Sequence, residues 1–508
     1  MKMGQHKKLM SVILCIAMCL TLFGGNIALA QGKEDEPVQG IACSEGCILE
    51  SGHEGDCVMA VDDDTESVSE QDAGAEEVIE ETEKTEPAND ATESERLPML
   101  SREAVPMAEP SSTVATIGED SYASLKSAFE NVKTGETIIL QENITGLTTD
   151  GIATLAAGKK ATFDMNGKSI TVAPDFAGRP IVNEGELTVV GNGVIDASAS
   201  ESDGLGAINN KGTLTIENGT YRGAKYASGS AIRNTGSGAV LTIENGTFDG
   251  ATCAVFNEGT VTINNGTFTG TTCSQCNGDI WSYTIRNYTT DCKMTINGGT
   301  FTGVQGAVSA SVGYLEINGG TFKTVKCVSD PSHTATFYAL YAAGEVGKVK
   351  CVINDGHFET EGQYTAVLIG NDNDGGIHEE ATGIINGGTF AAPEGVPALK
   401  GAEKTGDPQI NGGTFSSDVS KYVSDDAGKM IEDKDGNYVV KEYVAETGGE
   451  KYIYLQDAID AANGGTVTLV ADTTESVEIP TGVEVTLDLG EFTLTNEAGN
   501  IRLRTVAH

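Results

Sequence analysis

Arginine and phenylalanine recur at one position of a repeated strand pattern. The residue between an inward Ile or Val and the following Asn is Arg233, then Phe256, then Arg286 in successive repeats. Stacking of the repeats would place Phe256 between the two arginines on the solvent side, where this combination suits sugar, carboxylate or peptide contacts. The only tryptophan, Trp281, lies shortly before Arg286, and its ring could stack on a sugar. A ladder with a purely structural role fits the same pattern.

Four potential metal ligands lie close together near the N-terminus. Cys43, Cys47, His53 and Cys57 form a ligand set that suits tetrahedral zinc, although their spacing only approaches that of a zinc knuckle. The alternative is one disulfide with a spare thiol, which is natural in an exported protein. Because so short a segment holds no fold by itself, we expect a cross-link of one kind or the other.

A short phrase recurs along the chain and would position the arginine and phenylalanine residues. Its clearest copy runs from Leu241 to Phe248 (LTIENGTF), where apolar residues alternate with polar ones as in a half-buried strand. Each copy ends at an aromatic residue: Tyr221, Phe248, Phe268, Phe301, Phe322, Phe358, Phe390 and Phe415. These residues are 20 to 36 positions apart, which indicates coils with loop insertions of different lengths.

A turn interrupts every copy of the phrase. One position is always filled by a residue that tolerates positive φ and is always followed by Gly: Asn218, Asn245, Asn265, Gly298, Gly319, Asp355, Gly387 and Gly412. We therefore predict a left-handed backbone conformation at this position in each coil.

A second strand precedes the phrase in several repeats and ends in asparagine. These residues are Asn183, Asn210, Asn234, Asn257 and Asn287. We expect their side-chain amides to hydrogen-bond from coil to coil and to satisfy a buried corner.

Two or three short strands per repeat predict an all-β, right-handed parallel β-helix with a rise of about 4.8 Å per coil. A leucine-rich horseshoe would need more Leu and intervening helices.

Residues 122–132 carry apolar side chains at helical spacing and should form a short helix that caps the first coil. A similar pattern returns at Tyr454, so a second β-helix should begin near Tyr443. It stops at His508 after too few coils, which we interpret as truncation.

The flanking segments complete a five-part organisation. Lys2, Lys7 and Lys8, an apolar run and the Ala28-Leu-Ala motif indicate a cleaved secretory signal. Between positions 62 and 95 there are 15 acidic residues and one lysine, as expected for a disordered spacer. We therefore expect a signal peptide at 1–30, a Cys/His-rich module at 31–60, an acidic linker at 61–115, a β-helix domain at 116–440 and the start of a second, incomplete β-helix at 441–508.

Net charge and hydropathy restrict the partners. A formal net charge of −42 argues against nucleic acid and anionic lipid. Beyond the signal, no apolar stretch is long enough to span a bilayer, so we expect no membrane contact after cleavage.

Cysteines also follow the repeat. Cys253 and Cys273 each lie five residues after the aromatic residue of adjacent coils, so their Cα atoms should be within disulfide reach. Cys276 and Cys292 could form another pair. A row of free thiols in the core is the alternative.

From Ser121 to about Gly499 the chain resembles right-handed β-helix surface proteins of the pectate-lyase-like (pectin lyase-like) superfamily from Gram-positive gut bacteria. The Asn-Gly-Gly-Thr-Phe phrases, the opening at Tyr454 and the closing segment from Thr414 to Tyr422 carry the resemblance. The resemblance implies the fold but not the activity, because the superfamily contains polysaccharide lyases, glycoside hydrolases and non-catalytic adhesins.

Catalytic residues of those enzymes have no evident counterpart in the sequence. A lyase would need a calcium-binding acidic cluster and an Arg or Lys base, and a hydrolase would need neighbouring Asp residues. His357 occupies a turn position, and His333 and His378 lie in insertions without an evident partner. Residues 371–376 resemble half of a calcium loop but lack its final Glu, so we expect a polar turn and no calcium site.

Three functions follow from these patterns. The favoured one is a non-catalytic, secreted or cell-surface adhesion module that binds polysaccharide or another host or bacterial surface ligand. A polysaccharide lyase or glycoside hydrolase is the first alternative. A self-associating envelope scaffold is the second.

Overall fold

A computed structural model describes residues 112–496, with gaps at 203–204, 225–228, 271–281, 290, 328–337, 372–377, 434 and 480–481. The expected signal peptide, the zinc candidates Cys43, Cys47, His53 and Cys57, and nearly all of the acidic linker lie outside the described residues, as does Trp281. Among the described residues, none of the helices has the length and apolar character needed to cross a bilayer.

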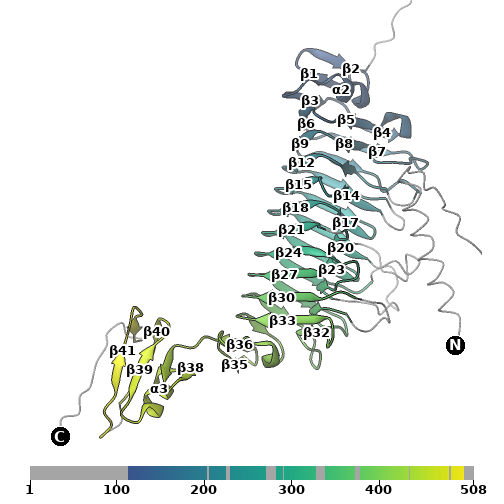
Figure 1. The fold of residues 1–508 in the computed structure, drawn as a ribbon. Helices are drawn as coiled ribbons and strands as arrows, with labels where there is room; N and C mark the ends of the chain where they lie inside the picture. Colours follow the sequence, from purple (N-terminus) through teal and green to yellow (C-terminus); the bar gives the residue numbers. More distant parts are fainter. Residues whose placement is uncertain are drawn as a thin grey trace, which may run out of the picture. The chain divides into compact units, whose positions relative to one another are not determined.

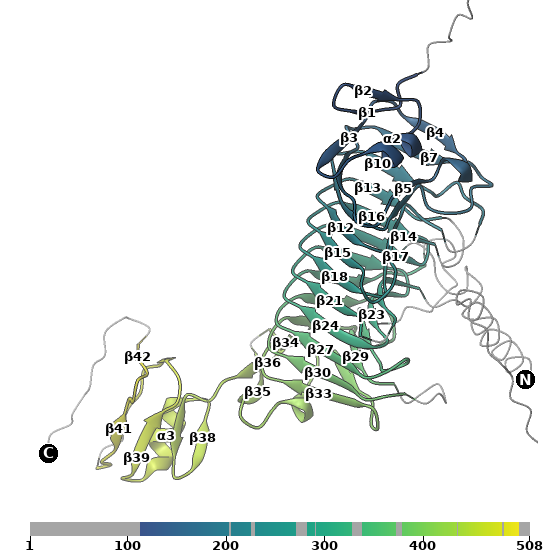
Figure 2. The same ribbon diagram turned by 45° about the horizontal axis from the view of Figure 1, so that its top comes forward.

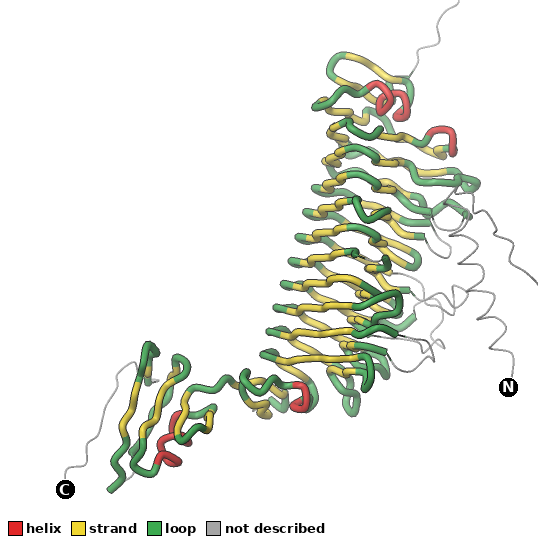
Figure 3. The backbone as a smooth tube through the Cα atoms, in the orientation of Figure 1, coloured by secondary structure: helices red, strands yellow, loops and turns green. Residues whose placement is uncertain are grey.

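Three long sheets wind around a common core and form a parallel β-helix (Figure 1). The chain passes from sheet A to sheet B to sheet C in each coil and then returns to sheet A. The connections from sheet A to sheet B are short in every coil, whereas those that enter and leave sheet C vary in length (Figure 3). The prediction of a right-handed parallel β-helix is confirmed.

Sheet A contains β2 (Asp120–Tyr122), β1 (Ala115–Ile117), β3 (Glu136–Leu140), β6 (Lys160–Asp164), β9 (Glu186–Val190), β12 (Thr213–Ile216), β15 (Val240–Ile243), β18 (Thr260–Ile263), β21 (Lys293–Ile296), β24 (Gly313–Ile317), β27 (Val349–Ile353), β30 (Ala381–Ile385) and β33 (Gly406–Ile410). Sheet B contains β35 (Lys429–Glu432), β36 (Tyr438–Lys441), β34 (Thr414–Phe415), β31 (Thr389–Ala391), β28 (His357–Thr360), β25 (Thr321–Thr324), β22 (Thr300–Gly303), β19 (Thr267–Gly270), β16 (Thr247–Gly250), β13 (Thr220–Arg222), β10 (Val194–Asp196), β7 (Ser169–Val172) and β4 (Ile144–Leu147). Sheet C contains β32 (Leu399–Gly401), β29 (Val367–Ile369), β26 (Leu340–Ala342), β23 (Gly306–Ala310), β20 (Tyr283–Asn287), β17 (Cys253–Asn257), β14 (Ser230–Asn234), β11 (Ile208–Asn210), β8 (Ile181–Asn183) and β5 (Ala153–Leu155).

The aromatic residues of the phrase form a continuous stack inside the β-helix. From Tyr221 to Phe415, neighbouring ring centroids are 4.6–5.1 Å apart and the ring planes lie within 10° of each other. All eight rings are buried. Because sheet B pairs them in register, for example Phe248 with Phe268, each ring covers the next one along the axis.

The turn between sheets A and B corrects the sequence prediction by one residue. Positive φ occurs at the second position of the turn, for example +135° at Gly246 and +107° at Gly299, and not at Asn245 or Gly298 before it. A Cβ at Gly299 would lie 2.9 Å from the carbonyl oxygen of Gly266 in the coil below. The second position therefore requires Gly on two grounds, whereas the first position need only be small or polar.

Asparagines line the buried corner between sheets C and A. The side-chain amide of Asn183 donates to Asn210 Oδ1 at 2.7 Å, and the same contact links Asn210 to Asn234, Asn234 to Asn257 and Asn257 to Asn287 at 2.7–2.9 Å. Each of the first four amides also donates to a main-chain carbonyl of a neighbouring strand or loop. The row therefore satisfies a corner that is closed to water.

A second row of asparagines lies outside, where the sequence analysis did not expect one. Each residue follows a sheet A strand directly, and from the second member onward each amide donates to the preceding member at 2.7–2.9 Å. The row comprises Asn264, Asn297, Asn318, Asn354, Asn386 and Asn411. The sequence pattern that could have predicted this row is the Asn that directly follows Ile in the phrase TINGGTF. It was overlooked because the turn residues next to it were considered only for their backbone conformation.

The first coil is closed as predicted. Helix α2 (Leu125–Asn131) begins at the N-cap Ser124, whose side chain accepts a hydrogen bond from the main-chain N–H of Ser127. Its buried residues Leu125, Ala128 and Phe129 cover the core next to β5 (Figure 2). The short 3₁₀ helix η1 (Thr149–Gly151) precedes β5.

The last coil ends differently, with an antiparallel arrangement. Strand β36 pairs antiparallel with both β34 and β35, and the 3₁₀ helix η2 (Ser420–Tyr422) lies between β34 and β35 in the chain. This hairpin occupies the edge of sheet B that a further coil would otherwise extend.

The C-terminal segment repeats the order of elements found at the start of the β-helix. It contains β37 (Ala445–Thr447), β38 (Glu450–Tyr452), α3 (Leu455–Ala462), β39 (Thr466–Leu469), β40 (Thr473–Thr474), β41 (Thr486–Asp488) and β42 (Leu494–Thr495). Strand β39 pairs parallel with β41, and β40 with β42, which corresponds to one step between coils. The segment has its own core around Leu455, Ile459 and Val467.

We expect the buried and the exposed asparagine rows to differ sharply in their effect on stability. Asn234→Ala removes three donated hydrogen bonds and leaves Asn210 without its acceptor, so unfolding should become easier by about 3 kcal/mol. Asn297→Ala, the matched exposed change, should alter the free energy of unfolding by less than about 0.5 kcal/mol. Urea denaturation followed by circular dichroism measures both. Equal losses would contradict the assignment of the inner row as the structural one.

Candidate ligand-binding face

The arginine and phenylalanine residues singled out in the sequence lie on one row of sheet C. Arg233 in β14 pairs with Phe256 in β17, and Phe256 pairs with Arg286 in β20. The row continues at Ser309 in β23. These strands are successive neighbours in the sheet (Figure 1), so the side chains follow one another along the axis at the spacing of strands.

Each arginine of this row lies over an aromatic ring, one ring in the row itself and one directly after β20. The guanidinium carbon of Arg233 lies 4.9 Å from the centroid of the Phe256 ring, and that of Arg286 lies 4.9 Å from the centroid of Tyr288. The rings of Phe256 and Tyr288 are 5.4 Å apart. We call Arg233, Phe256, Arg286 and Tyr288 the sheet C stripe. All four side chains are half-buried or exposed, with Tyr288 at 37%.

Positive charge gathers here in a strongly acidic chain. The described part of the chain contains four arginines, of which Arg233 and Arg286 belong to the stripe. Arg233 forms an ion pair with Glu258 at 2.7 Å, whereas Arg286 makes no ion pair with any described residue. On sheet B, by contrast, Arg222 contacts both Asp196 at 3.0 Å and Asp249 at 3.5 Å.

A third arginine, Arg179, is buried beside the stripe. Its guanidinium donates to the carbonyl oxygen of Ser230 at 2.7 Å and to the hydroxyl of Ser230 at 2.8 Å. Burial, and after it the charge of Arg233, lower the pKa of Arg179 to about 9. A Cβ on Gly206 would come within 2.5 Å of this guanidinium, so the glycine makes room for it. Arg179 therefore remains charged at neutral pH and links three coils.

Four buried polar atoms around the stripe make no hydrogen bond with any described residue. They are Arg233 Nε, Arg286 Nε, Ser309 Oγ and Tyr283 Oη, all of them shielded from solvent. Ser309 and Tyr283 are each only 1% exposed. Unpaired buried polar groups are rare in folded proteins, and each one calls for an explanation such as a bound group.

Tyr283 is buried, but its ring lies outside the main core to which alternation along β20 would assign it. Its ring belongs to a separate cluster, stacked on Tyr341 with centroids 5.7 Å apart. The reason is Gly306 in the next coil, where a Cβ would lie 2.2 Å from the Tyr283 ring. Without that Cβ the ring extends across the strand. Burial raises the pKa of Tyr283 well above its ordinary value, so the phenol stays protonated.

The cysteines within the described residues favour the thiol alternative over disulfides. Cys253 and Cys292 are free and buried, as is Cys351, and their expected partners Cys273 and Cys276 lie outside the described residues. The thiol of Cys253 donates to the carbonyl oxygen of Val255. Burial raises the pKa of Cys253 to about 12, of Cys292 to about 11 and of Cys351 to about 12.

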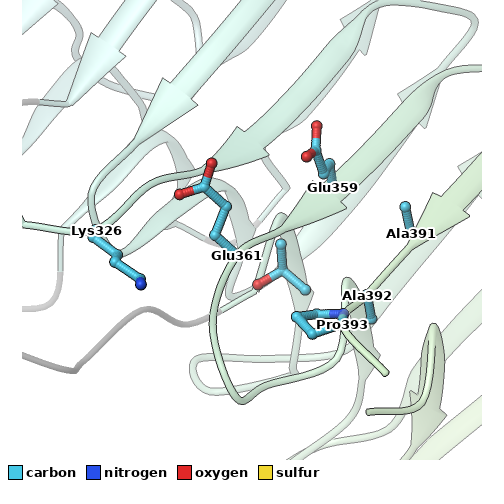
Figure 4. Close-up of a pocket in the computed structure, with 7 residues that line it drawn as sticks. Lys326, Glu359, Glu361, Ala391, Ala392 and Pro393 are labelled. Carbon is cyan, nitrogen blue, oxygen red and sulfur yellow. The ribbon is translucent and has the colours of Figure 1, made fainter. Parts of the chain in front are cut away.

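A pocket on sheet B contains a second cluster of charged side chains, separate from the sheet C stripe. It has a volume of about 420 Å³ and is lined by Lys326, Glu359, Thr360, Glu361 and residues 391–393 (Figure 4). Lys323 Nζ contacts Glu359 at 3.2 Å and Glu361 at 3.0 Å. Because one lysine pairs with both carboxylates, this arrangement suits a structural clamp between coils.

The histidine and metal predictions have mixed outcomes. His357 takes the position of the phrase Thr, as expected, and its Nδ1 lies 2.6 Å from Thr389 Oγ1. Within the described residues, no group of three or more His, Cys, Asp or Glu is placed to hold a metal ion. Most of the half calcium loop and His333 lie outside those residues.

Comparison with protein-family models, curated proteins and solved structures finds no match. What the sheet C stripe binds must therefore be argued from its own geometry.

We expect the buried thiols to be inert in the folded chain. With a pKa near 12, Cys253 should react with iodoacetamide at pH 8 about a thousandfold more slowly than in the unfolded chain. Peptide mass spectrometry locates the label. Between about pH 9 and pH 12 the unfolded chain loses this proton and the folded chain keeps it, so the thiol should lower stability as pH rises. Rapid labelling of Cys253 in the folded chain would contradict its burial.

Proposed function

We propose that the chain is a secreted or cell-surface, non-catalytic β-helix protein that binds glycans through the sheet C stripe. The secretory signal pattern and acidic spacer in its sequence support an extracellular place. Its repeat phrases support a kinship with pectate-lyase-like surface proteins of Gram-positive gut bacteria. The β-helix would serve as a rigid adhesion module.

The pairing of each guanidinium with an aromatic ring in the sheet C stripe carries this proposal. Sugar rings present apolar faces that stack on Phe256 and Tyr288, and hydroxyl groups that accept hydrogen bonds from Arg233 and Arg286. A pyranose unit in an extended chain is about as long as one strand spacing. A glycan lying along the axis would therefore meet the same contact at successive coils.

Two other functions give different results in the same experiment. An enzyme would release reducing or unsaturated ends, and the carboxylates of Glu359 and Glu361 would be the first to replace. A self-associating scaffold would show no glycan retention and would form larger species as its concentration rises.

We expect Phe256→Ala to weaken glycan retention about tenfold, because it removes the ring that lies between the two arginines. Tyr314→Ala, an aromatic change on the outward side of sheet A, is the matched control and should bind as the parent does. Affinity electrophoresis of the full chain through gels containing plant, mucin or bacterial polysaccharides measures both. If the two variants behave alike on every retained glycan, the sheet C stripe is not the binding face.

A further inference from the structure

We propose that Asn245 and Asn265 are sites of spontaneous deamidation, in which the side-chain amide is lost and an aspartyl or isoaspartyl residue remains. Each is followed directly by a glycine, Gly246 or Gly266, in the turn between sheets A and B. Glycine favours this reaction because it has no Cβ to obstruct the approach of its main-chain nitrogen to the asparagine side chain. Such a modification needs only water and is independent of the proposed glycan binding.

The reaction closes a ring between the asparagine side chain and the next main-chain nitrogen. The nitrogen of Gly246 gives its proton to a hydroxide ion and attacks Asn245 Cγ, so that a new N–C bond forms. The bond from Cγ to the side-chain nitrogen breaks. That nitrogen takes a proton from water and leaves as ammonia, which regenerates the hydroxide. A second water then opens the succinimide at either of its two carbonyl C–N bonds, which yields aspartate or, with the main chain routed through Cβ, isoaspartate.

The residue at the same turn position of a later coil shows that this geometry is within reach. Asp355 Oδ1 accepts a hydrogen bond from the main-chain N–H of Gly356 at 2.7 Å. Gly356 has a φ of +136°, close to the +135° of Gly246 and Gly266. In this turn conformation a side-chain carbonyl group can therefore approach the following main-chain nitrogen.

The amides of Asn245 and Asn265 are not held away from that nitrogen. Both side chains are exposed, and neither makes a hydrogen bond with any described residue. The main-chain nitrogens of Gly246 and Gly266 likewise donate to no main-chain carbonyl in the described part of the chain. Asn463, which precedes a glycine in the C-terminal segment, is also exposed and meets the same conditions, so it should react as well.

Other Asn-Gly pairs of the β-helix hold their amides through contacts between coils. Asn218 occupies the same turn position as Asn245, and Gly219 after it also has positive φ, but its amide donates to Asn192 Oδ1 at 2.7 Å. In the exposed asparagine row, four members precede a glycine and donate to the preceding member at 2.7–2.9 Å: Asn297, Asn318, Asn386 and Asn411. These hydrogen bonds must break before the side chain can turn toward the next nitrogen, which raises the barrier. The exposed asparagine row therefore protects its own Asn-Gly pairs.

The two products should differ in their effect on the coil. Aspartate at the position of Asn245 should be tolerated, since Asp355 fills the same turn position in a later coil. Isoaspartate adds one atom to the main chain directly before Gly246, whose carbonyl oxygen accepts from the main-chain N–H of Thr267 at 2.8 Å. Because that contact joins neighbouring coils, the isoaspartyl form should melt at a lower temperature than the aspartyl form.

The test incubates the full chain under native conditions and, in parallel, unfolded in guanidinium chloride at the same mildly alkaline pH. Peptide mass spectrometry at successive times locates each replacement of an amide by a carboxyl group. In the folded chain we expect Asn245 and Asn265 to react at least about tenfold faster than Asn218 and the four protected members of the exposed row. In the unfolded chain these differences should disappear. Equal rates in the folded chain, or reaction of Asn245 and Asn265 only after unfolding, would overturn the proposal.

The variant Asn192→Ala separates the hydrogen bond from the turn conformation. It removes the acceptor of the Asn218 amide and leaves the glycine after Asn218 in place. We expect Asn218 to deamidate about tenfold faster in this variant, whereas Asn245 should keep its rate within about twofold. A general loosening of the fold would raise the rate at Asn297 as well. An equal rise at Asn218 and Asn297, or no rise at Asn218, would therefore show that the held amide is not what protects these pairs.

Discussion

The stacking of each residue on its own counterpart in the next coil governs this structure. A parallel, in-register β-helix places every side chain about 4.8 Å from its equivalents above and below, so each row must be compatible with itself. Aromatic rings and amides satisfy this condition by repetition, as in the Phe248 stack and the Asn234 row. Charged residues satisfy it only by alternation. Sheet B accordingly places Arg222 between Asp196 and Asp249.

Self-compatible rows are also what made the fold predictable. Some residue types return at the same position of successive coils, such as the aromatic residue of the phrase and the corner asparagine. This repetition alone predicts that their side chains stack in the same environment. The turn was misplaced by one residue for an instructive reason. Positive φ was predicted at the variable position, which is filled by Asn, Asp or Gly. The structure has positive φ at the invariant glycine that follows it. A glycine that is present in every copy of a repeat therefore indicates positive φ more reliably than a position whose different residues all tolerate it.

The candidate site was only half predictable, because its residues do not all repeat. Register alone placed Arg233, Phe256 and Arg286 on one face. Ser309 follows in the same row, but nothing in its type distinguishes it, and Tyr283 lies where an insertion of different length enters sheet C. Strand alternation cannot reveal that Gly306 gives its ring a path across the strand. Such contacts are made between residues of two different coils, so the sequence pattern of a single coil cannot predict them.

The sheet C stripe departs from the rule that holds elsewhere in the β-helix. Arg222 is balanced from both neighbouring coils, and Lys323 by Glu359 in the next coil, whereas Arg286 has Phe256 on one side and Ser309 on the other. A half-exposed guanidinium over a ring tolerates this at little cost, because water and the ring share its solvation. The buried hydroxyls of Ser309 and Tyr283 beside it make no hydrogen bond with any described residue, and each therefore lowers stability. This row is therefore unbalanced in both charge and hydrogen bonding, and it carries a cost in stability that the other rows avoid.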